Sequence, residues 1–212
     1  LKQGDPAVYG RVGEEILYFR KRGFESVVVP GISSAIAGPM LAGIPVTQRG
    51  VAESVVVCTG VGRGGKLARL PGYVRSRTVV LLMGVARLDS LLETLMGSQI
   101  EENNKEEEGG RERGVREGDA YPANVPIAVI ERASMPDQRV VFATLESVGE
   151  AMKSVGEQRP PGMIVIGWSV LALDGEGDVE VLTEDAKLDD ARTRRWLGGA
   201  RWSVREGFVK WD

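Results

Sequence analysis

The sequence opens with the stretch that decides its fold, Leu1-Lys2-Gln3-Gly4-Asp5-Pro6-Ala7-Val8-Tyr9-Gly10, followed at 11–15 by Arg-Val-Gly-Glu-Glu. Gly4 and Gly10 bracket a turn, Asp5 supplies an acceptor, and Pro6 suits the first position of a helix. The apolar spacing from Glu14 onward predicts a helix that stops at Gly23. A strand end, a glycine turn with one carboxylate and then a helix is how α/β proteins bind small polar ligands. An ordinary strand-to-helix connection, in which Gly-Asp-Pro only caps, is the other interpretation of this stretch.

The composition is that of a globular protein. The chain has 212 residues, of which 42 % are apolar and 27 % charged, enough for one large domain or two small ones. No apolar run approaches the roughly 20 residues that cross a bilayer, so we expect no membrane partner. The ligand turn comes only a few residues after Leu1, whereas a strand needs about five residues and a neighbour. We therefore expect that the chain lacks its beginning.

Two residue types limit the possible chemistry. Cys58 is the only cysteine, which excludes an internal disulfide and suits a reducing compartment, so we expect a cytoplasmic protein. Cys58 lies inside a predicted strand, and we interpret it as a core residue rather than a reactive thiol. Histidine is absent, which excludes Ser-His and Cys-His nucleophile pairs and most zinc sites within this chain. A magnesium site built from carboxylates alone stays open.

The acidic charge is concentrated in one segment. Residues 99–120 hold eight acidic and four basic side chains, a net charge of −4, so the rest of the chain carries +1 of the total of −3. This segment lacks apolar periodicity, and we predict a disordered insertion. Because the remainder is nearly neutral, no basic stripe indicates a nucleic-acid partner.

Buried strands and amphipathic helices alternate along the rest of the chain. The pattern predicts strands at 26–29, 54–60, 77–84, 126–131, 140–145 and 161–167, and helices from 32, at 87–96 and at 145–155. Ser33 or Ser34 is the expected N-cap of the second helix, and 43–50 reads as a linker. The predicted class is α/β. The glycines at 60–65 do not match a phosphate loop, because Leu67 stands where a hydroxyl belongs. Residues 171–182 read as a terminal loop or hairpin, and the last residues as an appended tail.

Five motifs carry a resemblance to a known family. They are Leu-Lys-Gln-Gly-Asp-Pro through Gly-Glu-Glu at 1–15, Val-Val-Pro-Gly-Ile-Ser-Ser-Ala at 28–35, Ala-Gly-Ile-Pro-Val-Thr-Gln-Arg-Gly at 42–50, Leu-Met-Gly at 82–84 and Ile-Glu-Arg-Ala-Ser at 130–134, the last extended by Pro136 and Gln138-Arg139-Val140. In this order they closely resemble the uroporphyrinogen-III C-methyltransferases of the tetrapyrrole methylase family, over about residues 1–182. The acidic insertion and the segment from Pro161 to Leu173 look like fungal members.

The resemblance implies a two-domain α/β fold with the cofactor S-adenosyl-L-methionine between the domains. Residues 1–50 would be the last part of an incomplete first domain, 51–182 the second domain and 183–212 the tail. The implied reaction methylates uroporphyrinogen III to precorrin-2 for sirohaem, releases S-adenosyl-L-homocysteine, uses no metal and takes place in a homodimer. The implied cofactor contacts are Gln3, Gly4, Asp5, Val8, Ser33, Ser34, Met83 and Ala133.

For a substrate rich in carboxylates we expect arginines around the cleft: Arg11 first, Arg49 or Arg63 less so. The family's acid–base residues would precede Leu1, so no catalytic residue is assigned within this chain.

Several alternatives stay open. A methyltransferase of the same family could act on another precorrin or on diphthine. The chain could also be a non-catalytic remnant that binds adenosyl compounds or dimerises. A dinucleotide-dependent oxidoreductase is disfavoured, because no Gly-x-Gly-x-x-Gly with a downstream acid follows a predicted strand.

Overall fold

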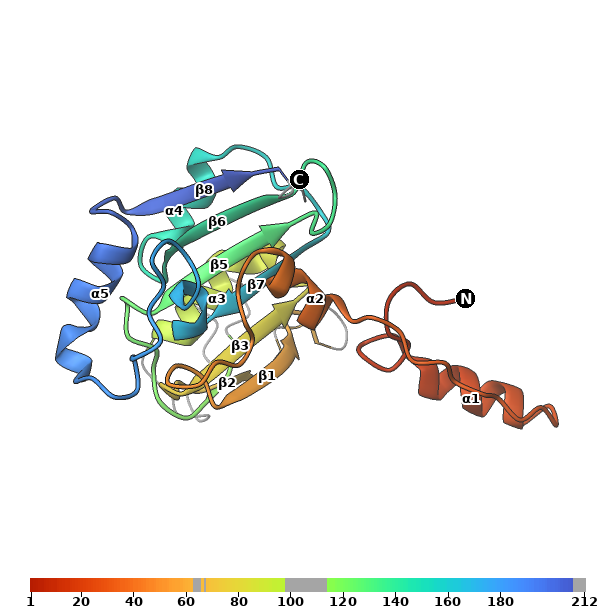
Figure 1. Ribbon diagram of the computed structural model, residues 1–212. Coiled ribbons are helices and arrows are strands. Elements are labelled where there is room, and N and C mark those ends of the chain that lie inside the picture. Colours follow the sequence, from red (N-terminus) through yellow and green to blue (C-terminus); the bar gives the residue numbers. More distant parts are fainter. Residues whose placement is uncertain (63–65, 67, 98–113, 208–212) are drawn as a thin grey trace, which may run out of the picture.

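The computed structural model describes residues 1–62, 66, 68–97 and 114–207. Its centre is a six-stranded mixed sheet in the order β1-β3-β7-β5-β6-β8 (Figure 1). The strands are β1 Ser54–Thr59, β3 Arg77–Leu82, β5 Pro126–Glu131, β6 Arg139–Thr144, β7 Gly162–Ile166 and β8 Trp202–Glu206. A separate two-stranded pair joins β2 Leu70–Pro71 to β4 Arg116–Glu117.

The helices are α1 Val12–Arg20, α2 Ser34–Leu41, α3 Leu88–Met96, α4 Val148–Ser154 and α5 Asp189–Trp196, with 3₁₀ turns at Val85–Arg87, Trp168–Leu171 and Ala186–Leu188. The predicted α/β class is therefore confirmed. The strands expected near 54–60, 77–84, 126–131, 140–145 and 161–167 are all present within a residue or two, as is the helix near 87–96. The helix expected at 145–155 is present but begins three residues later, at Val148.

Strand direction places particular chain segments at the same end of the sheet. β1 and β3 are parallel, β7 is antiparallel to both β3 and β5, and β8 is antiparallel to β6. Because β5 and β6 are also antiparallel, β1, β3, β5 and β8 all point the same way. We call the end at which these four strands finish the carboxyl edge.

The alternation of side chains along the strands builds two cores. On one face Val79, Leu81, Ile127 and Ile164 lie in a cluster with the leucines of α3. On the other face Val80, Ala128 and Val165 lie in a cluster with Ala35 of α2 and Ile44. Period-two burial is the pattern of a sheet covered on both sides. Residues 43–50, expected as a linker, form an irregular segment, and Ile44 within it is buried in this second cluster.

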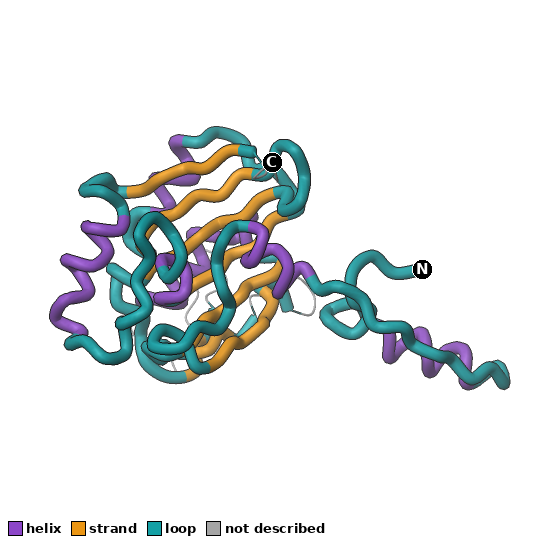
Figure 2. Tube along the Cα trace, viewed as in Figure 1, coloured by secondary structure: helices purple, strands orange, loops and turns teal. Residues whose placement is uncertain are grey.

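The N-terminal arm, residues 1–32, differs from the prediction. α1 forms where the helix was expected but has no buried residue, and Figures 1 and 2 show it projecting away from the sheet. The strand predicted at 26–29 is wrong: the segment has no regular structure, and Val27 and Val29 are 92 % and 76 % exposed. β-branched residues favour a strand, but a strand also needs a hydrogen-bonded neighbour, and no described strand pairs with this segment.

The acidic insertion and the tail also need correction. Residues 99–113 of the insertion lie outside the described part, but its end is ordered. Arg116 in β4 is buried and donates to the carbonyls of Thr94, Leu95 and Gly97 at 2.6, 2.9 and 2.8 Å. The tail is not a simple appendage, because β8 is the sixth strand of the sheet.

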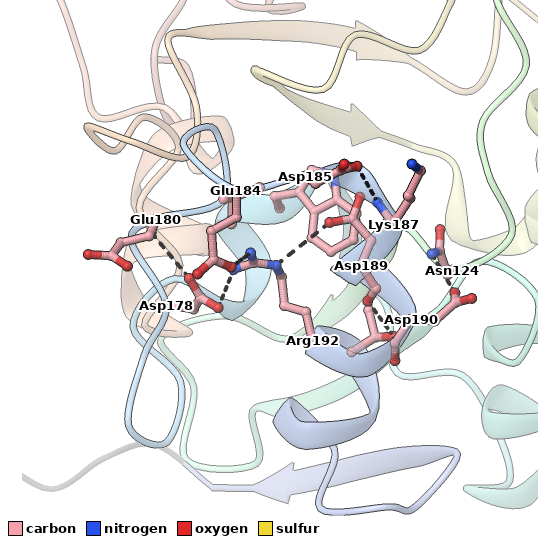
Figure 3. A network of polar contacts seen from close by, with 12 residues as sticks. Asn124, Asp178, Glu180, Glu184, Asp185, Lys187, Asp189, Asp190 and Arg192 are labelled. Atoms are coloured by element: carbon pink, nitrogen blue, oxygen red, sulfur yellow. Dashed lines mark hydrogen bonds and ion pairs between the residues drawn. The ribbon is translucent and has the colours of Figure 1, made fainter.

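An ionic cluster holds the tail helix in place. Arg192 of α5 has a side chain only 2 % exposed and pairs with Asp178 and Glu184, while its Nε lies 3.7 Å from Asp189 (Figure 3). Arg75 donates to the same Asp189 at 2.8 Å, which joins α5 to the segment before β3. Residues 171–182 are therefore an irregular segment that supplies a carboxylate to this cluster, rather than a hairpin.

Candidate functional site

The loop at 4–10 is organised by the carboxylate of Asp5. Its Oδ1 accepts from the backbone N–H of Ala7 at 2.8 Å and of Val8 at 3.2 Å, and its Oδ2 accepts from Gly31 N–H at 3.0 Å. These donors, with Gly31 the largest contributor, hold the pKa of Asp5 below its ordinary value. Asp5 thus caps its own turn, as the simpler interpretation required, and also joins that turn to a second loop.

The second loop approaches so closely that only glycine fits. A Cβ built on Gly31 would lie 2.4 Å from the carbonyl oxygen of Gly4, and one built on Gly4 would lie 3.4 Å from that of Ile32. Gly4 itself has φ of 74°. The turn that follows Lys2-Gln3 and the turn that precedes α2 therefore lie side by side.

The turn at Gly31 leads directly to the expected N-cap. Ser33 has extended backbone angles, and its Oγ accepts from Ala35 N–H at 3.2 Å, while Ser34 is the first residue of α2. The prediction of a serine N-cap is confirmed. The Ser33 hydroxyl still has its own hydrogen to donate, and Ser34 is exposed.

Met83 and Ala133 lie at the carboxyl edge. Met83 follows β3 and is 53 % exposed, and Ala133 follows β5. One strand, β7, separates them in the sheet, which corresponds to about 10 Å between their strands. α2 extends to Ala133, because a Cβ on Gly38 would lie 3.7 Å from Ala133 Cβ and 2.5 Å from Met163 Cε.

Tyr9 connects the N-terminal arm to β1, the strand at one side of the sheet. Its hydroxyl donates to the carbonyl of Val57 in β1 at 3.3 Å, and burial raises the pKa of the phenol. No role for Tyr9 was predicted from the sequence. An aromatic residue in a turn carries no signal of what it contacts 48 residues away.

Backbone strain marks the same region. The non-glycine residues with positive φ in the described part of the chain are Tyr9, Arg11, Met83, Arg132 and Ser134. Two flank Gly10 in the arm, one is Met83, and two flank Ala133. Left-handed backbone costs free energy in non-glycine residues and concentrates at ligand-binding sites. The strained positions thus lie at or next to candidate residues in both the arm and the carboxyl edge.

A buried ion pair supports the loop that carries Ala133. Glu131 and Arg139 are both 1 % exposed and pair at 2.6 Å, and Glu131 Oε1 also accepts from Arg159 N–H at 2.8 Å. Arg139 donates further to the carbonyls of Val155 and Glu157, each at 2.7 Å. A buried pair with all these partners fixes the surrounding backbone. Neither residue was given a role from the sequence, although both lie in the motif that begins at Ile130.

Only some of the predicted site residues lie close to one another. Gly4, Asp5 and Ser33 meet through Gly31, and Met83 and Ala133 share the carboxyl edge with α2. Gln3 and Val8 lie on the exposed arm. Two surface hollows, of about 650 and 480 Å³, are lined by other residues, near Ser147 and Arg87. The candidates therefore form two groups, one at the two turns and one at the carboxyl edge, and neither of these two hollows encloses them.

The expected substrate arginines have different surroundings. Arg11 is exposed and its Nε donates to Glu14 Oε1 at 2.9 Å, a contact that raises the pKa of the guanidinium. Arg49 lies in the irregular segment between α2 and β1, and its role stays a prediction. Arg63 lies outside the described residues.

Two further expectations concern the thiol and the membrane. Burial raises the pKa of Cys58 to about 11, in agreement with a core role. Among the helices of the described ranges, none combines the length and hydropathy needed to cross a bilayer.

Comparison with known proteins identifies the family. The model of the tetrapyrrole (corrin/porphyrin) methylases matches residues 1–149. The chain is 42 % identical over 169 residues to the probable uroporphyrinogen-III C-methyltransferase of Schizosaccharomyces pombe, covering 80 % of this chain and 30 % of that protein. It is also 42 % identical over 173 residues to the Saccharomyces cerevisiae uroporphyrinogen-III C-methyltransferase, covering 82 % and 26 %.

A solved structure shows the same fold. The uroporphyrin-III C-methyl transferase of Thermus thermophilus, complexed with S-adenyl homocysteine, matches with a TM-score of 0.52 and 32 % identity, covering 79 % of this chain and 64 % of that one. The chain thus spans about 30 % of the length of its fungal relatives. The family model covers well over half of the chain, so this protein belongs to the tetrapyrrole (corrin/porphyrin) methylases.

Proposed function

We propose that the chain belongs to an S-adenosyl-L-methionine-dependent enzyme that methylates uroporphyrinogen III at carbon to give precorrin-2 for sirohaem, and that it supplies part of the cofactor site. The observation that carries the proposal is the coincidence of strained backbone with the candidate residues at the arm and the carboxyl edge. The identity to fungal and archaeal uroporphyrinogen-III C-methyltransferases supports the choice of substrate.

The residues at the two turns suit the polar part of the cofactor. The Asp5 carboxylate accepts three backbone N–H groups and keeps lone-pair capacity for an ammonium or a ribose hydroxyl. Ser33 and Ser34 at the start of α2 offer hydroxyl donors and the positive end of the helix to a carboxylate. Gly4 and Gly31 leave the backbone open to close approach, with Gln3 and Val8 on the flanks.

The carboxyl edge suits the apolar part of the cofactor. Met83 and Ala133 would offer an apolar wall, and their own peptide groups would bond to an adenine ring. When bound, the cofactor supplies an activated methyl group on its sulfonium. The chain's own contribution is then to align donor and acceptor carbon, an effect that can account for about 7–11 kcal/mol of a barrier. Arg11 would leave Glu14 to hold a substrate carboxylate.

We further propose that residues 1–50 belong to the first domain and 51–182 to the second, in a cytoplasmic homodimer. The packing of α2 on β3 and β7 is then a contact between the two domains. The second domain would then continue into residues 183–207, because β8 pairs with β6 and the ionic cluster of Arg192 joins α5 to the same domain.

Isothermal titration with S-adenosyl-L-homocysteine tests the cofactor site. We expect the 212-residue chain to bind and Asp5→Asn to bind about tenfold more weakly, because an amide cannot accept in the same way from all three donors. Asp185→Asn is the matched control, since Asp185 likewise accepts from a backbone N–H, that of Lys187 at 2.9 Å, away from the site. Absence of binding by the unsubstituted chain would refute the proposal.

Incubation with S-adenosyl-L-methionine and uroporphyrinogen III tests the reaction. Mass spectrometry should show a product that has gained two methyl groups. A product formed only with another precorrin or with diphthine would change the proposed substrate but not the family. Cofactor binding without any product would show that this chain supplies cofactor contacts without a complete catalytic site.

A further inference from the structure

Gln138 lies between the loop of Ala133 and helix α2. Its side chain is almost fully buried, with 2 % of the residue exposed. Its Oε1 accepts from Ser134 N–H at 2.8 Å, and its Nε2 donates to the carbonyl oxygen of Leu41 at 3.4 Å. One amide side chain therefore contacts the last residue of α2 and the residue directly after Ala133.

The carbonyl of Leu41 needs such a donor. In a continuing helix it would accept from the residue four positions on, but that residue is Pro45, which has no N–H. The carbonyl of the next residue, Ala42, accepts from Arg205 of β8. Gln138, directly before β6, and Arg205 of β8 thus both donate to the carboxyl end of α2, and a cation there also suits the helix dipole.

Ala133 lies between two strained residues, Arg132 and Ser134, with φ of 51° and 70°. Strained backbone persists only where surrounding contacts enforce it. The Ser134 N–H bond to Gln138 is such a contact, made by the same side chain that docks α2. The positions of the Ala133 backbone and of the helix that begins at Ser34 are therefore set by one group.

We propose that Gln138 is a positioning residue that holds the loop at 132–137 and helix α2 in a fixed mutual arrangement, so that the cofactor contacts on these two elements keep their spacing. The inference rests on the proposed cofactor site. Gln138 does not touch the cofactor; it acts through Ser134 and Leu41.

The test uses the substitution Gln138→Glu in the 212-residue chain, with S-adenosyl-L-homocysteine titrated at pH 8.0 and pH 5.5. The ionised carboxylate still accepts from Ser134 N–H but cannot donate to Leu41, and it faces a carbonyl oxygen. We expect the dissociation constant at pH 8.0 to rise about ten- to a hundredfold relative to wild type. At pH 5.5 the buried carboxyl is protonated, donates again, and brings the constant back within about threefold.

The wild type is measured at both pH values, and each dissociation constant of the variant is divided by the wild-type constant at the same pH. This ratio removes the effect of other groups that titrate near the loop, including Asp137 and Glu206. The matched control is Gln158→Glu, because Gln158 also donates to a backbone carbonyl, that of Val85 at 3.3 Å, but joins neither α2 nor the loop. It adds the same charge and should change binding less than threefold at either pH. An equal loss at both pH values in Gln138→Glu, or no loss, would overturn the inference.

Hydrogen exchange gives a readout that does not depend on the cofactor. In Gln138→Glu the amides of α2 and of residues 132–137 should exchange faster together at pH 8.0, with those of α3 unchanged. If that variant does not fold, as judged by circular dichroism, Gln138→Ala is used with the same expectation. Wild-type protein that fails to bind would refute the proposed function, while the exchange result would still decide whether Gln138 couples the two elements. Faster exchange in only α2, or only in residues 132–137, would refute the inference that Gln138 couples these two elements.

Discussion

The substitution Gly31→Ala tests whether the close contact of two loops forms the cofactor site. Gly31 has no positive φ, so the effect of alanine depends on whether its Cβ atom fits between the two loops. The new Cβ would lie 2.4 Å from the Gly4 oxygen, whereas real Cβ atoms keep at least 3.0 Å. The obstruction is backbone, which cannot rotate away as a side chain would.

The loops must therefore separate by about 0.6 Å. That shift would lengthen the 3.0 Å bond from Gly31 N–H to Asp5 Oδ2 to about 3.6 Å, a distance at which the hydrogen bond is lost. Overpacking costs about 1–3 kcal/mol in cores, and we expect the lower part of that range in an exposed loop. About 1–2 kcal/mol corresponds to a 5- to 30-fold weaker binding of S-adenosyl-L-homocysteine.

Isothermal titration measures the effect, with Gly13→Ala as the matched control. A Cβ on Gly13 meets nothing within 4 Å, and alanine favours the helix α1 in which it lies. The melting temperature should stay unchanged in both variants, because neither core cluster contains a residue before Ala35. Binding of Gly31→Ala within twofold of wild type, or an equal loss in Gly13→Ala, would refute the reasoning.

Three further predictions concern charged groups. Because the pKa of Asp5 is lowered, chiefly by Gly31 N–H, its contacts should persist above its ordinary value of 3.8 and be lost only as pH falls below it; an NMR titration of the carboxyl carbon measures this. Glu131→Ala leaves a buried arginine unpaired and should lower the free energy of unfolding in urea by about 3–5 kcal/mol. Arg192→Met removes the cation from its ionic cluster and should speed amide hydrogen exchange throughout α5, whereas the control Arg194→Met, at an exposed position, should not. Equal exchange rates in the two variants would contradict the role of the ionic cluster in holding α5.

Much of the sheet could be predicted because its four inner strands are largely buried on both faces and β1 is half-buried along its whole length. Ser54–Thr59, Arg77–Leu82 and Gly162–Ile166 are continuous apolar or β-branched runs between turn residues, and such runs identify a strand without knowledge of its neighbours. The same rule failed at 26–29, where the run is as β-branched but no described strand pairs with it. It also passed over β8, whose sequence Trp-Ser-Val-Arg-Glu reads as polar because the strand lies at the edge of the sheet.

The candidate site divides in a similar way. The turn of Gly4 and Asp5 and the cap of Ser33 could be predicted because turns and caps are local chemistry, and the bonds of Asp5 and Ser33 confirm these two local roles. Their contact with a cofactor stays a prediction. Glu131, Arg139 and Gln138 could not be given roles, because each acts through a partner distant in sequence. A charge or amide in the chain does not reveal whether it will be buried.

The amino-acid sequence by itself determined the class of fold, most of the strands and helices, and the family, since these follow from hydrophobic period, turn residues and ordered motifs. Tertiary structure alone decided that Gly31 touches Gly4, that strain collects around Met83 and Ala133, and that Gln138 joins α2 to the loop after β5. The physical reason is that backbone conformation, close contact and burial arise from packing between segments far apart in the chain, which no local pattern records.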